Sequence, residues 1–273
     1  PNSFKSALIP FFAGIPKRTG WLGELRYGVL NNYQKLNKTA LPLMVQRIAT
    51  LAYFDQKDNF NQQDFAKNNL EEYYPQLELD PTIKQACSAK FNLKADDKYL
   101  VLAPGAAFGD TKKWPEEYFA SVAVAKIQQG FKVVLLGSAK DRITTDNITY
   151  LINSQLKGLS HDQCLNLAGM LELVETVAII AQADAIVSND SGLLHVAASV
   201  NTPLIGIYGS TSPDFTPPLI KDSKKVILTV ENLNCRPCFQ KTCRYGHLKC
   251  LRDLHPPLVN NAIDKVTDNL CAS

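Results

Sequence analysis

The feature that most constrains the fold is an alternation of apolar runs and amphipathic segments that begins near residue 98. The runs at 99–103 and 131–137 have the length of buried strands. Between them, a segment that starts at Trp114 has proline and acids in its first turn and apolar residues at helical spacing. Strands that alternate with helices are typical of a parallel sheet covered on both faces. We therefore predict an α/β fold with a doubly wound parallel sheet.

Two strand-to-helix junctions in this pattern have the chemistry of a ligand site. The apolar run at 185–187 ends in Ser-Asn-Asp-Ser-Gly at 188–192 and continues as a helix to about residue 200. A helix that starts at the carboxyl end of a parallel strand exposes unpaired backbone N–H groups, which bind anions and especially diphosphates. A second such turn, at 104–106, is followed by Lys112 and Lys113. The two junctions together indicate a nucleotide-linked substrate.

The first candidate residues each allow a functional and a structural interpretation. Gly105 either lets the backbone approach a ligand closely or simply forms a tight turn. Lys112 and Lys113 either neutralise a diphosphate or are solvated surface lysines. Asp190 either accepts hydrogen bonds from sugar hydroxyls or only caps the helix that follows it.

The remaining candidates lie on the same predicted sheet edge. Ser191, Gly192 and Leu193 are expected to present backbone N–H groups to phosphate. His195 is either a histidine packed in the core or a hydrogen-bond donor behind the site. Asp141, after another strand end, either contacts a ribose hydroxyl or caps a helix.

Several classes of protein are excluded or disfavoured by the sequence. It contains neither a Gly-x-Gly-x-x-Gly pattern nor a P-loop, which argues against a dehydrogenase or a P-loop enzyme. No apolar run reaches the ~20 residues that cross a bilayer, and the first residues lack the pattern of a secretion signal, so we expect a cytoplasmic protein. Residues 1–47 are basic, which suits either an anionic partner or a solvated face.

Four of the seven cysteines lie close together in the sequence, at Cys235, Cys238, Cys243 and Cys250. A disulfide framework is not expected in a cytoplasmic protein. Four thiols can form a tetrahedral zinc site, for which His247 offers a further ligand, but the x2, x4, x6 spacing is not that of a zinc ribbon. A structural zinc site and reduced or adventitiously oxidised thiols therefore remain alternatives.

Taken together, these motifs resemble glycosyltransferase family 9. The resemblance rests on Pro-Gly-Ala at 104–106, Lys-Lys-Trp-Pro at 112–115, Ser-Asn-Asp-Ser-Gly-Leu-Leu-His-Val-Ala-Ala at 188–198 and Tyr-Gly-Ser-Thr-Ser-Pro-Asp-Phe-Thr-Pro-Pro-Leu at 208–219. The segments 1–7, 14–21 and 26–28 are similar to the family as well, so the resemblance covers almost the whole chain.

The resemblance implies a GT-B fold of two Rossmann-like doubly wound domains, the amino-terminal one incomplete. Residues 1–95 would be a partial acceptor-binding domain and linker, 96–255 the nucleotide-sugar domain and 256–273 a carboxyl-terminal helix. It further implies inverting transfer of heptose from ADP-L-glycero-D-manno-heptose, with no required cofactor. The acceptor would be the first heptose of the lipopolysaccharide inner core, on an anionic lipid A–Kdo–heptose molecule at the cytoplasmic face of the inner membrane. Peripheral membrane contact is implied, and no nucleic acid.

The family's site residues carry over to matching positions. The resemblance implies phosphate binding by Lys112 and the backbone at 191–193, sugar contact by Asp190 and, more loosely, ribose contact by Asp141. The catalytic base of the family lies in an amino-terminal strand and Gly-rich loop that have no counterpart in residues 1–273. We therefore expect these residues alone to be inactive.

Two other functions remain compatible with the sequence. A GT-B sugar-nucleotide epimerase shares the fold but needs acid and base residues in the cleft, which the sequence does not identify. The chain is also compatible with a non-catalytic ADP-sugar-binding fragment.

Overall fold

The computed structural model describes residues 3–55, 61–65, 70–94, 96–156, 158 and 162–271. The chain forms two compact units. Unit 1 comprises Pro1–Tyr73 with Asp214–Pro217, and unit 2 comprises Tyr74–Pro213 with Pro218–Ser273. These bounds differ from the predicted boundaries after residues 95 and 255. No helix in the described part of the chain is long and apolar enough to cross a membrane.

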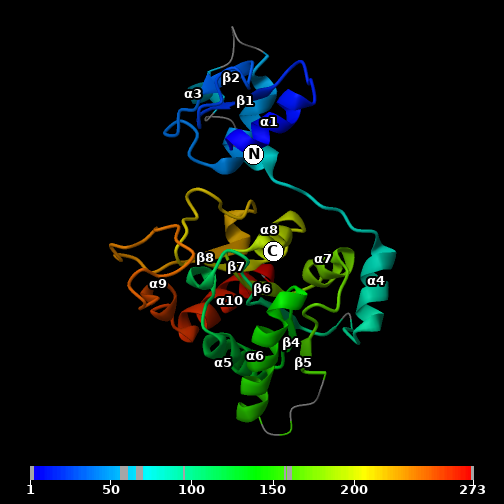
Figure 1. Ribbon diagram of the computed structural model, residues 1–273. Helices are drawn as coiled ribbons and strands as arrows, with labels where there is room; N and C mark the ends of the chain where they lie inside the picture. Colours follow the sequence, from blue (N-terminus) through cyan, green and yellow to red (C-terminus); the bar gives the residue numbers. More distant parts are fainter. Residues whose placement is uncertain are drawn as a thin grey trace. The chain divides into compact units, whose positions relative to one another are not determined.

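In the described part of unit 2, six strands form one sheet, and helices surround it (Figure 1). Its elements are α4 (Pro81–Lys90), β3 (Tyr99–Ala103), η3 (Asp110–Lys112), α5 (Glu116–Gln128), β4 (Lys132–Leu135), η4 (Ala139–Asp141), α6 (Arg142–Gln155), β5 (Cys164–Asn166), α7 (Leu173–Ala181), β6 (Ala185–Asn189), α8 (Gly192–Ser199), β7 (Leu204–Ile207), η5 (Asp222–Lys224), β8 (Lys225–Leu228), α9 (Lys249–Arg252) and α10 (Pro256–Cys271).

All strands of this sheet are parallel, in the order β5-β4-β3-β6-β7-β8. The first strand in sequence, β3, lies in the middle, with Leu100 opposite Val133 of β4 on one side and Ala185 of β6 on the other. This is the strand order of a Rossmann fold, in which ligands bind where the chain changes direction, between the carboxyl ends of the two central strands. The predicted parallel sheet is confirmed, and the expected site belongs between β3 and β6.

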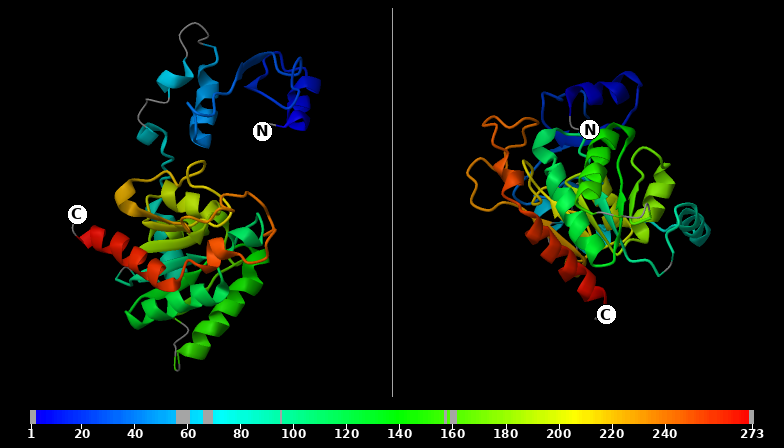
Figure 2. Two further views of the ribbon diagram at one scale, coloured as in Figure 1. Left: turned by 90° about the vertical axis from the view of Figure 1, so that its left-hand side faces the viewer. Right: turned by 90° about the horizontal axis from the view of Figure 1, so that it is seen from below.

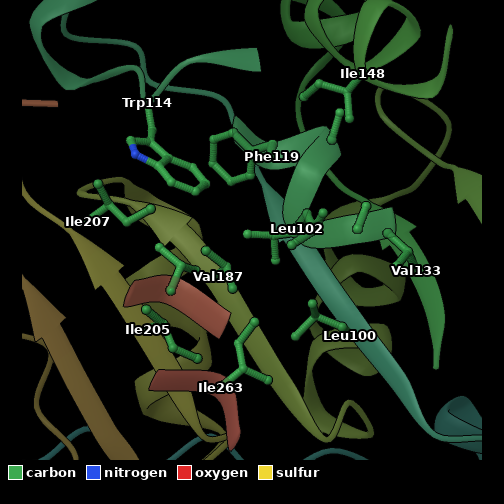
Figure 3. Close-up of a cluster of buried hydrophobic side chains, with 14 of the residues drawn as sticks. Leu100, Leu102, Trp114, Phe119, Val133, Ile148, Val187, Ile205, Ile207 and Ile263 are labelled. Atoms are coloured by element: carbon green, nitrogen blue, oxygen red, sulfur yellow. The ribbon is translucent and has the colours of Figure 1, made fainter. Parts of the chain in front are cut away.

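Two apolar clusters hold the sheet between its helices. On one face, Leu100, Leu102 and Val187 pack against side chains from α5, α6 and α10, with Trp114 and Phe119 edge to face at 4.9 Å between ring centroids (Figure 3). On the other face, Val101 and Ile186 alternate with these residues and pack against α4, α7 and α8. The alternation along each strand explains why its apolar run is continuous.

The terminal helix α10 and the helix α4 are both part of unit 2. α10 lies along α5 (Figure 2), where the fully buried Lys126 forms an ion pair with Asp264. α4 starts at Pro81 with Asp80 as its N-cap and buries Cys87 on the second face of the sheet. Proline is favoured at the first position of a helix, which explains why α4 begins at Pro81.

Unit 1 is smaller and contains a parallel pair of strands. Its elements are α1 (Phe4–Phe12), β1 (Thr19–Leu22), β2 (Asn32–Lys35), α2 (Met44–Ala49), η1 (Thr50–Tyr53), α3 (Gln62–Phe65) and η2 (Leu70–Tyr73). Trp21 packs edge to face on Phe54 at 4.8 Å between ring centroids, in a cluster with Leu41 and Phe65.

The arginines of unit 1 explain much of its basic character. Arg18, Arg26 and Arg47 each donate through Nε to a backbone carbonyl, of Val29, Gly23 and Leu41 respectively. Arg26 is buried, with 3% of its surface exposed. These charges therefore stabilise irregular backbone within unit 1. For the exposed lysines of this unit, an anionic partner and a solvated face remain the alternatives.

Candidate functional site

The carboxyl ends of β3 and β6 are joined by Asn189, the last residue of β6. Its Nδ2 donates to the Pro104 carbonyl at 2.7 Å, and its Oδ1 accepts from the Trp114 N–H at 3.1 Å. Asn189 is completely buried. Because one side chain bonds both ends of the segment 104–114, that loop is held at the point where the strand order reverses.

Lys112 and Asp190 meet in this loop region. The Lys112 Nζ atom lies 2.5 Å from Asp190 Oδ2, and the exposed fractions of the two side chains are 15% and 6%. Thr211, from the loop after β7, donates its hydroxyl to the same carboxylate oxygen at 2.6 Å. Residues that follow three different strands thus meet at one carboxylate, and the arrangement is charged, largely buried and hydrogen-bonded.

The two neighbouring lysines have different environments. Lys113 lies 3.6 Å from Asp110 and 41% of its side chain is exposed. A surface pair of this kind is screened by solvent and contributes little. The structure therefore distinguishes the two lysines: Lys112 is largely buried beside Asp190, and Lys113 lies at the surface.

The N-terminus of α8 lies beside this pair, and its cap corrects one alternative. Ser191 is the N-cap residue, so the interpretation of Asp190 as a helix cap is wrong. The Asp190 carboxylate bonds Lys112 and Thr211 instead, and its backbone N–H donates to the Ile207 carbonyl of β7 at 3.0 Å. Gly192 is exposed, and a Cβ built there would meet no atom within 4 Å.

Gly105 and Asp141 are packed together at the same edge. A Cβ on Gly105 would lie 2.6 Å from the Asp141 Cγ atom, so any larger residue there would have to displace the Asp141 carboxylate. Asp141 Oδ2 accepts from the Ser138 N–H at 2.8 Å and from its hydroxyl at 2.6 Å, so Asp141 is the third residue of a capping box in which Ser138 is the N-cap of η4. Its predicted ribose contact stays a prediction. The close approach that Gly105 permits is to Asp141.

His195 lies on α8, half-buried behind Asp190. Burial lowers the pKa of His195; the Asp190 carboxylate raises this pKa and the Lys112 ammonium lowers it. The net effect favours neutral imidazole near neutral pH, which can donate one hydrogen bond and accept another. His195 is therefore neither a core residue nor a fixed positive charge.

The four clustered cysteines line one small cavity together with Arg236 and His247. Cys235, Cys238, Cys243 and Cys250 are free thiols. Burial raises the pKa of Cys250 to about 11, whereas a hydrogen bond from the Leu248 N–H is the main cause that lowers the pKa of Cys243. Among the described residues, no group of three or more His, Cys, Asp or Glu side chains is arranged to hold a metal ion.

Two residues of the site escaped the sequence analysis as individual candidates. Thr211 lies in the segment 208–219, which contributes to the family resemblance, and Asn189 lies in the Ser-Asn-Asp-Ser-Gly segment at 188–192. The pairing of Thr211 with Asp190 follows from the neighbouring positions of β6 and β7, so the strand order was the missing information.

The model of glycosyltransferase family 9 (heptosyltransferase) matches residues 1–249. Lipopolysaccharide heptosyltransferase 2 of Escherichia coli K12 is 46% identical over 228 residues, which are 84% of this chain and 63% of the relative. The chain thus spans less than two thirds of this relative's length.

Solved structures agree with the family match. The structure of E. coli ADP-heptose lps heptosyltransferase II has a TM-score of 0.81 and 40% identity, and the match covers 100% of this chain and 75% of that one. A family 9 glycosyltransferase from Veillonella parvula has a TM-score of 0.72 at 19% identity, over 96% of this chain and 70% of that one, which supports the fold alone. The predicted GT-B α/β fold class is confirmed by these matches.

Proposed function

The chain belongs to glycosyltransferase family 9, the heptosyltransferases, and on that premise we propose that the protein transfers heptose from ADP-L-glycero-D-manno-heptose during synthesis of the lipopolysaccharide core. The acceptor hydroxyl belongs to the first heptose of a lipid A–Kdo–heptose molecule. The similarity to an E. coli ADP-heptose lps heptosyltransferase II supports this donor and this acceptor class.

The observation that carries the proposal is that Lys112, Asp190 and Thr211 meet at the carboxyl ends of β3 and β6, where the strand order reverses. A diphosphate that enters this region meets the Lys112 ammonium and the N-terminus of α8 together. Charge-assisted hydrogen bonds and a helix N-terminus both favour a dianionic group. Asp190 is then available to accept hydrogen bonds from hydroxyls of the heptose.

The proposed reaction is a single displacement with inversion at the anomeric carbon. A base removes the proton of the acceptor hydroxyl while the bond from the anomeric carbon to the ADP oxygen breaks. Negative charge grows on the departing diphosphate. Lys112 and the backbone N–H groups at 191–193 stabilise that charge because they are already in place, so the reaction requires no metal ion.

The acceptor is anionic and lipid-linked, so we propose that the enzyme works at the cytoplasmic face of the inner membrane through peripheral contact. Exposed lysines of unit 1, Lys5, Lys35 and Lys38, support contact with an anionic glycolipid surface. Charge attraction and the bound acceptor would together hold the enzyme at the membrane.

We assign no catalytic base within residues 1–273 and propose that this chain alone binds the donor but does not transfer heptose at the family's rate. General-base catalysis contributes about 10²–10⁴-fold, which sets the size of the expected deficit. The E. coli relative has further residues beyond the matched region, since the match covers 63% of its length.

Calorimetry with ADP-heptose, ADP and UDP, beside an assay of heptose transfer to a heptosyl lipid acceptor, tests the proposal. We expect both ADP compounds to bind more tightly than UDP. Transfer should require a longer version that also carries the residues of the E. coli relative outside the matched region. Preference for UDP compounds would instead favour epimerase chemistry. Equal transfer rates for both versions would place the base within these 273 residues.

A further inference from the structure

The long connection between β8 and α9, residues 229–248, is held against the loops that carry Lys112 and Thr211 (Figure 1, orange). The N–H groups of Cys238 and Phe239 both donate to the Ser210 carbonyl, at 3.0 and 2.9 Å. The function proposed above gives this connection, here called the β8–α9 loop, no role.

The two loops that it touches are also joined to each other. The Ser210 N–H donates to the Thr111 carbonyl at 3.1 Å, and the Ser210 hydroxyl donates to the Thr111 hydroxyl at 3.0 Å. The approach is so close that a Cβ on Gly209 would lie 2.4 Å from the Thr111 carbonyl oxygen. Ser210 and Thr111 directly precede Thr211 and Lys112, so their bonds fix the backbone at both site residues.

Arg236 is the side chain of the β8–α9 loop that reaches the loop after β7. Its Nε donates to the Gly209 carbonyl at 2.7 Å, its Nη2 to the Thr211 carbonyl at 3.0 Å, and its Nη1 to the Val230 carbonyl at 3.5 Å. A planar guanidinium can hold three carbonyls at fixed angles, which a flexible ammonium cannot.

Thr211 connects Arg236 to the charged pair. Its carbonyl accepts from Arg236, and its hydroxyl donates to Asp190, which pairs with Lys112. Without the guanidinium, two carbonyls of the β7 loop lose their partner and the loop can move. Asp190 would then keep only Lys112 as a partner and hold the ammonium more strongly against a diphosphate.

From this chain of contacts we infer that Arg236 is a positioning residue for the diphosphate site: it fixes Thr211, and through Thr211 the Asp190–Lys112 pair. The inference rests on the proposed function, because it assigns Arg236 to the binding of the ADP part of the donor. In this inference Arg236 acts on the charged pair through Thr211, whose carbonyl it holds.

The test measures the Kd for ADP by calorimetry in the full 273-residue chain. Arg236→Ala should raise the Kd about tenfold, since charged hydrogen bonds that hold the site are lost. Arg244→Ala is the matched control: this arginine lies on the same loop, is exposed and packs over the Tyr245 ring at 4.8 Å. The Kd of Arg244→Ala for ADP should stay within about twofold of wild type. A tenfold higher Kd in this control would mean that the loss of any positive charge from the loop weakens binding, and that Arg236 has no specific positioning role.

A double-mutant cycle separates positioning from a general loss of structure. Thr211→Val removes the hydroxyl that links the loop to Asp190. If Arg236 acts through this link, Arg236→Ala should raise the Kd less than about twofold in the Thr211→Val background. If instead the increases in Kd of the two single variants multiply in the double variant, the two residues act independently and the inference is overturned. This holds even if each single variant binds ADP weakly.

The conservative variant covers the case in which Arg236→Ala does not fold. A lysine can donate to one or two of the three carbonyls, so a folded Arg236→Lys protein should show a Kd raised about threefold. An unchanged Kd in Arg236→Lys would overturn the inference. If the folded wild-type chain itself does not bind ADP, the proposed function fails; if wild type binds ADP and Arg236→Ala binds equally well, only the inference fails.

Discussion

The Lys112 Nζ atom lies 2.5 Å from the Asp190 Oδ2 atom, at the carboxyl ends of the neighbouring strands β3 and β6. The lysine expected to bind a diphosphate therefore has a carboxylate partner of its own. A diphosphate must compete with this carboxylate for the ammonium, but the pairing keeps the lysine in place and avoids an unpaired, largely buried charge. The two partners should consequently respond to substitution in different ways.

Lys112→Ala should weaken ADP binding by roughly 1.5–3 kcal/mol, the range for a charge-assisted contact. It should also lower the melting temperature, because Asp190 loses its cationic partner while it stays 6% exposed. Calorimetry with ADP and a thermal melt check the two effects separately.

Lys113→Ala is the matched control for Lys112→Ala. Lys113 is the adjacent lysine, its side chain is 41% exposed, and it faces Asp110 across 3.6 Å. Neither the free energy of ADP binding nor the free energy of unfolding should change by more than about 0.5 kcal/mol, the usual effect of a surface substitution. A larger loss for Lys113→Ala than for Lys112→Ala would move the phosphate site to the exposed lysine.

Asp190→Asn should separate donor recognition from nucleotide binding. The amide keeps a hydrogen-bond acceptor for Thr211 but removes the charge that competes for Lys112. ADP affinity should therefore stay within about threefold of wild type or improve, whereas ADP-heptose should lose roughly 1.5–3 kcal/mol if the carboxylate holds sugar hydroxyls. Both values come from one series of calorimetric titrations.

The opposite result for Asp190→Asn is well defined. Equal losses for ADP and ADP-heptose, together with a lower melting temperature, would give Asp190 a structural role only. Asp190→Ala in the Lys112→Ala background serves as the control, since the double variant leaves no unpaired charge behind.

Much of the fold follows from local sequence signals. The runs around 99–103 and 185–188 are continuous in apolar residues because both faces of the sheet are covered, and that pattern predicts buried parallel strands. Strand β8, at Lys225–Leu228, escaped prediction because its four residues are only partly buried at the sheet edge and include a lysine.

The site was predicted less completely than the fold, because its contacts join distant parts of the chain. The sequence identifies Lys112 and Asp190 as candidates by the turns they follow, but their ion pair spans 78 residues. Thr211 and Arg236 gain their roles only through the adjacency of β6, β7 and the β8–α9 loop. No short motif encodes such an adjacency.

Stability should depend on pH through His195. Burial lowers its pKa from an ordinary value of 6.5, so the folded protein binds fewer protons at this site than the unfolded chain does. Above about pH 6.5 the imidazole is neutral in both the folded and the unfolded state, and the full stability of the folded protein at this site is retained. Stability from this site is lost as the pH falls below 6.5 and through the lowered pKa, by about 1.4 kcal/mol for each unit of lowering.

Thermal melts at pH 7.5 and 5.5 check this, with His195→Gln as the comparison that removes the titrating group but keeps hydrogen-bonding capacity. Wild type should lose more stability between the two pH values than His195→Gln does. An identical loss in both proteins would assign the pH dependence to other groups, and a smaller loss in wild type would mean that the sign of the His195 shift is wrong.

Gly105→Ala should destabilise unit 2, because the added Cβ would lie 2.6 Å from the Asp141 Cγ atom and 2.7 Å from both carboxylate oxygens. Overpacking of this kind costs about 1–3 kcal/mol. Gly192→Ala is the control on the same sheet edge, since its Cβ would meet nothing within 4 Å.

Asp141→Ala alone should cost about 0.5–2 kcal/mol through the lost cap. In the double variant the clash is absent, so Gly105→Ala with Asp141→Ala should cost less than the sum of the single changes. Chemical denaturation of the four variants measures this difference. Strict additivity would show that Gly105 is required for a reason other than its contact with Asp141, such as close approach of the backbone to the bound donor.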